Sequence, residues 1–108
     1  VRIAENTVNM ENEIDDDTKE EIQDESDLAL EMLERSTEAF FQEDLDGANK
    51  AIDLGEKLEG MNHRLMSEVK QERKKNVTPL SYILESVYRT GSYAEDISEI
   101  SINYIMSR

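Results

Sequence analysis

Apolar side chains recur at helical spacing along three long segments of this chain. Between about Thr18 and Glu43, alternating spacings of four and three predict an apolar stripe of Ile22, Ser26, Ala29, Leu33, Ser36 and Phe40, which Leu28, Met32, Ala39 and Phe41 widen. Between about Leu45 and Lys74, the predicted inward face is Leu45, Ala48, Ile52, Gly55, Leu58, Asn62, Leu65 and Val69. From Leu80 to Met106 it is Leu80, Ile83, Leu84, Val87, Gly91, Ala94, Ile97, Ile102 and Ile105.

Polar breaks separate these three segments. Glu43 to Gly47 interrupts the first pattern, and Asp44 or Asp46 is suited to cap the helix that follows. Asn76 to Pro79 is the next turn, and Pro79 suits the first turn of a helix because its missing N–H costs nothing there. Such short connections make consecutive helices antiparallel neighbours. The chain is therefore predicted to be all-α, an antiparallel three-helix bundle.

A further short segment precedes the predicted bundle. Ile3, Val8 and Met10 fall close to one helical face, so residues 1–12 are predicted to be a short helical segment, the end of a preceding repeat. Residues 13–19 are predicted to be an acidic connector, because Asp15 to Asp17 repel one another. The bundle domain is then expected to cover residues 20–108.

Composition restricts the partners. The chain has 12 basic and 26 acidic side chains and a formal charge of -14, which repels nucleic-acid phosphates and anionic lipid headgroups. It has no cysteine, and no apolar run approaches the roughly 20 residues that span a bilayer. These features argue against a disulfide scaffold, thiol catalysis, a nucleic-acid partner and membrane insertion, and they favour a cytoplasmic location.

Patterns that carry catalysis or metal binding are sparse. His63 is the single histidine, whereas a di-metal site in a helical bundle needs Glu-x-x-His pairs on two helices. No Gly-rich phosphate loop and no Ser-His-acid order is evident. The aromatic pair Phe40 and Phe41 is interpreted as core rather than as a ligand pocket. We expect no enzymatic activity and no cofactor.

The third helix resembles a known signature. Tyr88 to Glu99, YRTGSYAEDISE, is similar to the segment read as Glu-Arg-Ile-Gly-Asp-(His/Tyr)-Ala-x-x-Ile-Ala-Glu in the PhoU-like phosphate-uptake regulators. Residues 1–10 echo this helix 94 positions earlier, with identities at Ile3, Glu5 and Asn9. Ala39 to Ile52 resembles the turn of the same family. The resemblance implies a carboxyl-terminal three-helix repeat, preceded by the tail of another.

The resemblance also implies which positions would hold metal. Family members bind metal through a Glu-x-x-x-Asp pair one turn apart on the third helix, where this chain has Tyr88 and Ser92, and Gly55 stands where the second helix tends to carry an acid. We therefore hypothesise that the metal site is lost, although Glu56, Glu85, Glu95, Asp96 and Glu99 could hold a cation elsewhere. The packing residues of the signature are kept at Arg89, Gly91, Ala94, Ile97 and Glu99.

Two functions follow from these patterns. The resemblance implies a non-enzymatic regulator of phosphate uptake and signalling that binds protein partners, such as a phosphate transporter ATPase or a sensor kinase. The alternative is a generic acidic bundle that serves as an oligomerisation or interaction module without a phosphate role. A homodimer is one expected assembly, because the apolar side of a severed repeat at residues 1–10 needs a partner surface.

Overall fold

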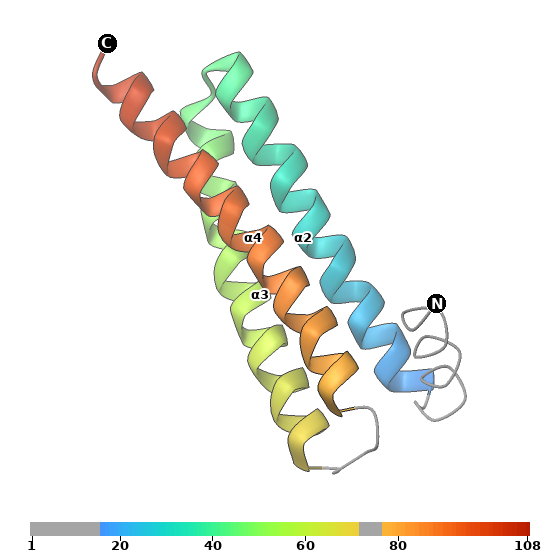
Figure 1. Cartoon of the computed structure of the whole chain (residues 1–108). Helices are drawn as coiled ribbons and strands as arrows, with labels where there is room; N and C mark the ends of the chain where they lie inside the picture. The colour runs from blue at the N-terminus through green and yellow to red at the C-terminus, as the bar shows by residue number, and fades with distance from the viewer. Residues whose placement is uncertain (1–15, 72–76) are drawn as a thin grey trace, which may run out of the picture.

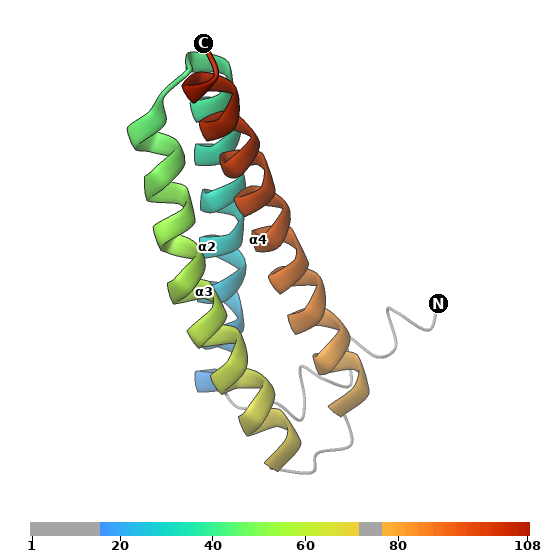
Figure 2. The same cartoon turned by 90° about the vertical axis from the view of Figure 1, so that its left-hand side faces the viewer.

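A computed structural model describes residues 16–71 and 77–108, which form three long α-helices packed side by side (Figure 1). They are α2 (Asp16–Gln42), α3 (Leu45–Gln71) and α4 (Val77–Met106). Successive helices run in opposite directions, so the end of α4 lies beside the α2–α3 turn in both views (Figures 1 and 2). The all-α, antiparallel three-helix bundle is thereby confirmed.

The amino-terminal boundary differs from the expectation. The predicted helical segment at residues 1–12 and the first part of the predicted connector, residues 13–15, lie outside the described residues. The rest of that connector, residues 16–19, already belongs to α2. Asp16 and Asp17 stand in the first turn of this helix, where negative charge interacts favourably with the positive end of the helix dipole.

The α2–α3 turn is fixed by hydrogen bonds at both helix ends. Glu43 has a φ of 54°, the Asp44 amide donates to the Ala39 carbonyl at 2.9 Å, and the Glu43 amide donates to the Phe40 carbonyl at 3.4 Å. This is the Schellman arrangement that ends a helix. The Gly47 amide then donates to Asp44 Oδ1 at 3.0 Å, so Asp44, one of the two predicted caps, begins α3.

The core is built in layers at coiled-coil spacing. One buried cluster joins Leu65 and Val69 to Leu80 and Leu84, and a second joins Leu28, Ala29, Met32, Leu58 and Ala94. Towards the α2–α3 turn the buried positions become small, comprising Ala39, Ala48, Ala51, Ser98 and Ser101. Small side chains allow neighbouring helix backbones to approach closely at that end.

The row of α2 residues that faces the other two helices lies next to the predicted row. Ser26 and Phe40 were predicted to face the core but are only partly covered, whereas Leu33 is partly buried and packs against it. The buried residues are Glu25, Leu28, Ala29, Met32, Ser36 and Ala39, of which Leu28, Met32 and Ala39 were predicted only to widen the stripe. The prediction was wrong there because α2 has apolar residues on two adjacent seams, and spacing alone does not tell which seam faces the other helices. Leu45 and Ile83, 36% and 37% exposed, are likewise peripheral rather than core.

Among the described helices, none combines the length and the apolarity that a bilayer-spanning segment requires.

Candidate functional site

The three positions that resemble replaced metal ligands lie between α3 and α4. Tyr88 and Ser92 stand one turn apart on α4, with Tyr88 39% exposed, and Gly55 is buried on α3. The heavy atoms nearest to a side chain at Gly55 belong to Glu95, whose Cγ would lie 3.2 Å from an added Cβ. Gly55 therefore accommodates a carboxylate from α4 instead of supplying one.

Glu95 is the centre of an acidic group at this helix pair. Burial raises the pKa of the Glu95 carboxyl, and the nearby carboxylates of Glu99, Glu59 and Asp96 raise it further. Within residues 16–71 and 77–108, no three His, Cys, Asp or Glu side chains come together in an arrangement that could hold a metal ion. The loss of the family's ligands stays a prediction, which metal analysis can test.

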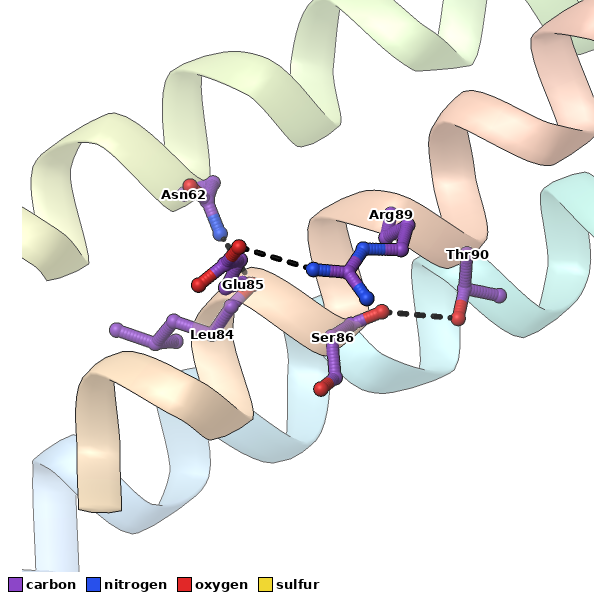
Figure 3. A network of polar contacts seen from close by, with 6 residues as sticks. All are labelled: Asn62, Leu84, Glu85, Ser86, Arg89 and Thr90. Carbon is purple, nitrogen blue, oxygen red and sulfur yellow. Dashed lines mark hydrogen bonds and ion pairs between the residues drawn. The ribbon is translucent and has the colours of Figure 1, made fainter. Parts of the chain in front are cut away.

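The retained signature residues have three different structural roles. Gly91 and Ala94 belong to the core, and a methyl group at Gly91 would overlap the Leu58 side chain. Arg89 is exposed and forms an ion pair with Glu85 at 2.9 Å on the same helix (Figure 3). Ile97 is half-buried on the side of α4 that faces α2.

Two polar side chains, the partly buried Asn62 and the fully buried Glu25, face the inside of the bundle. The Asn62 side chain of α3 points toward α4, and its Nδ2 donates to the Leu84 carbonyl at 2.8 Å (Figure 3). Glu25 of α2 is fully buried, and neither of its carboxyl oxygens has a hydrogen-bond partner within the described part of the chain. Burial raises the pKa of Glu25, and the Asn62 amide opposes part of this rise.

A second acid on α2 lies one turn before Glu25. Burial and the neighbouring Glu68 carboxylate raise the pKa of Glu21, whereas Arg64 opposes the rise. The structure thus holds two carboxyls with raised pKa values on the α3-facing side of α2. They are polar features of the packing between α2 and α3.

A continuous uncharged surface, which we call the α2–α4 face, runs between the other pair of helices. On α2 it comprises Ser26, Leu30, Leu33, Thr37, Phe40 and Phe41. On α4 it comprises Ile83, Ser86, Thr90, Tyr93, Ile97, Ile100 and Tyr104. Except for Phe41, these residues follow the alternating three-and-four spacing of a second coiled-coil seam.

This face contains large apolar groups that remain in contact with solvent. Leu30 and Ile100 are 60% and 58% exposed, although each borders a buried layer of the core. The rings of Phe40 and Tyr104 lie 6.3 Å apart across the two helices. Such contiguous exposed apolar surface is typical of a protein interaction site.

Two shallow hollows lie between α2 and α4, with volumes of about 210 Å³ beside Leu30 and Thr90 and about 270 Å³ between Phe40 and Ile100. A third, of about 410 Å³, borders this face on α2 alone, where Leu33 and Phe41 line it together with Glu34 and Glu38. The other two helix pairs differ from this one. The α2–α3 surface carries Asp24, Glu56, Lys57 and Arg64, and the α3–α4 surface carries the acidic group around Glu95.

The sequence analysis did not find the α2 part of this face, because it predicted a different side of α2 to face the core. Phe40 and Phe41, interpreted as core, are instead 38% and 77% exposed and line the hollows. Leu33 also lines a hollow, although it packs against the core. A signal was present, because Leu30 and Phe41 widen the apolar arc of α2 beyond what one helix pair can cover. The buried Glu25 was also missed, since a carboxylate is rarely assigned to a core position.

Comparison with known proteins agrees with this architecture. A family model described as PhoU domain matches residues 22–101, which includes most of α2, all of α3 and most of α4. This confirms the resemblance found in the α4 signature and in the α2–α3 turn. No curated protein and no solved structure gave a significant match.

Proposed function

We propose, because this chain belongs to the PhoU domain family, that it is a regulatory domain in the control of phosphate uptake and signalling which acts by binding protein partners. It needs no catalytic step for this role. Partners of the expected kind are a phosphate transporter ATPase or a sensor kinase, and binding to either would occur in the cytoplasm. Family membership supports the phosphate role.

The observation that carries the binding role is the α2–α4 face. It presents side chains as large as Leu30, Tyr93 and Ile100 to solvent in a chain of which 35% is charged, and none of its residues is charged. A domain that bound nothing here would gain solubility from charges at these positions. Buried apolar anchors of this kind supply most of the binding energy in protein interfaces.

Complementation in cells tests the proposal. A strain lacking the gene receives the wild-type chain in its native protein, Ile100→Glu on the face, or Asn49→Glu on the exposed side of α3. Both variants add one carboxylate at an exposed helix position, so both should fold. We expect wild type and Asn49→Glu to restore normal phosphate uptake, and Ile100→Glu to fail at equal protein level.

Two results would count against the proposal. If deletion of the gene changes neither phosphate uptake nor expression of phosphate-starvation genes, the phosphate role is wrong and the domain is better described as a generic interaction module. If Ile100→Glu complements fully, regulation does not use the α2–α4 face. Circular dichroism of both purified variants checks that the helices are intact.

A further inference from the structure

We propose that the α2–α4 face is the docking site for a basic amphipathic helix of a partner protein, which lies along the groove as a fourth helix of the bundle. This inference rests on the proposed function, because it names the chemistry of the partner that the regulatory domain would bind. It adds three specific claims: the partner element is helical, it is cationic at its flanks, and it is not a second copy of this chain.

The spacing of the face argues for a helix. On α4 the face repeats every three and four residues from Ile83 to Tyr104, and on α2 it repeats in the same way from Ser26 to Phe40. Two neighbouring helices with such seams form the groove into which a third element with heptad-spaced apolar residues packs its side chains. The α4 seam is about 32 Å long at 1.5 Å per residue, which matches roughly six turns of helix.

The hollows give the groove places for anchor side chains. The hollow between Phe40 and Ile100 is also lined by Thr37 and Ile97, and the one near Leu30 is also lined by the buried Ala29 and the half-buried Val87. Both hollows therefore combine exposed large side chains with more buried ones. Leucine or isoleucine side chains on an incoming helix would fill such hollows.

The charges at the edge of the face argue for a cationic partner. Glu34 and Glu38 line the hollow on α2, and neither has an ion-pair partner within the described residues, although Glu38 also borders the α2–α3 hollow that holds Arg35 and Lys50. On α4, Asp96 stands one turn from Ile100. Two cations lie at this face, Arg89 and Arg108, the latter over the Tyr104 ring, but they are already paired with Glu85 and Glu43. Lysine or arginine at the flanks of the partner helix would meet these free carboxylates.

The same charges argue against a second copy of the chain. A symmetric dimer through this face would bring Glu34 and Glu38 of both copies to one interface, and each copy carries a formal charge of -14. Like charges at an interface disfavour association. An anionic membrane surface is disfavoured for the same reason.

Binding of designed peptides to the purified full chain tests the inference. The probe is a synthetic helix of about 21 residues with leucine at the a and d positions of each heptad and lysine at e and g. A matched peptide carries glutamate at e and g. Fluorescence anisotropy should show 1:1 binding of the lysine peptide, with an affinity at least about tenfold above that of the glutamate peptide.

Variants separate groove binding from general attraction to an acidic protein. Ile100→Glu should weaken the lysine peptide about tenfold or more, whereas Asn49→Glu should not, since an unfilled or charged anchor site costs binding energy. A purely electrostatic attraction would instead be strengthened by the added carboxylate in both variants. The pair Glu34→Lys with Glu38→Lys should reverse the preference towards the glutamate peptide, and the control pair Asp53→Lys with Glu56→Lys on α3 should not.

Several outcomes would overturn the inference. They are equal binding of the two peptides, equal loss of binding in Ile100→Glu and Asn49→Glu, or a dimer of the free chain in sedimentation that Ile100→Glu dissociates. The last result would make a second copy the occupant. If Ile100→Glu abolishes phosphate control in cells but neither peptide binds, the proposed function stands and only the partner chemistry is wrong. If the lysine peptide binds as expected but deletion leaves phosphate uptake unchanged, the partner chemistry stands and the proposed phosphate role is wrong.

Discussion

Replacing Glu25 by methionine should stabilise the bundle, although it removes a charged residue from an acidic, well-solvated chain. Glu25 is fully buried, and within the described residues no donor makes a well-formed hydrogen bond to its two carboxyl oxygens, although burial raises its pKa and the neighbouring Asn62 amide lowers it in part. Methionine follows the same unbranched path and adapts to irregular space. The substitution therefore exchanges a desolvated acid for an apolar group at nearly constant volume.

Two contributions set the expected change in the free energy of unfolding. A buried polar group without partners costs about 1–3 kcal/mol, and burying the apolar end of the new side chain contributes roughly 1 kcal/mol. The Asn62 amide, which opposes part of the pKa rise of Glu25, reduces the first term. We expect Glu25→Met to raise the free energy of unfolding by about 2–3 kcal/mol at pH 7, and Tm by on the order of 10 °C.

The pH dependence gives an independent check. The pKa of Glu25 is raised in the folded protein above its ordinary value of 4.5, so the folded state binds more protons than the unfolded state between the two values. Stability at this site is therefore highest below about pH 4.5 and falls as the pH rises towards the folded pKa. Glu25→Met should flatten this fall, although Glu21 and Glu95 retain the same sign of dependence.

Urea denaturation followed by circular dichroism measures both effects at pH 5 and pH 7. Glu20→Met, at an exposed position of the same helix, is the control and should change stability by no more than about 0.5 kcal/mol. If Glu25→Met is destabilising while Glu20→Met is neutral, the carboxyl of Glu25 makes a stabilising contact, and the reasoning from its missing partners is refuted.

Three further predictions concern the glycines, the turn and metal content. Gly60→Ala should stabilise the protein by about 1 kcal/mol, because nothing lies within 4 Å of the added methyl. Gly91→Ala should destabilise it by about 1–3 kcal/mol, because its methyl would overlap the buried Leu58. Thermal melts of the two variants should therefore shift in opposite directions. Glu43→Gly should stabilise by roughly 0.5–1 kcal/mol, since Glu43 has a φ of 54°, and an unchanged or lower Tm would mean that its ion pair with Arg108 outweighs the backbone gain. Protein purified without chelator should contain no stoichiometric iron, zinc or manganese by elemental analysis, and one equivalent of any of these held between the helices would contradict the predicted loss of the metal site.

The sequence by itself determined the three helices and their antiparallel order. Helical spacing is a local property, and the breaks at Glu43 to Gly47 and before Pro79 contain residue types that end or begin helices. The family resemblance was likewise carried by contiguous segments, namely the signature Tyr88 to Glu99, its echo at residues 1–10 and the turn from Ala39 to Ile52. Asp44 was correctly among the predicted caps, because capping depends on residues only three positions apart.

Only the tertiary structure decided which seam of α2 faces inward. Ala29 lies on both candidate seams, and the choice between Met32 and Leu33 or between Ala39 and Phe40 depends on how tightly α3 and α4 approach. The small residues near Ala48 and Ser101 permit that close approach, so the small Ala39 is buried and the large Phe40 is displaced to the surface. The α2–α4 face exists because α2 has this orientation in the bundle. The periodicity of α2 cannot determine the orientation, since it depends on residues of α3 and α4 that are distant in the chain.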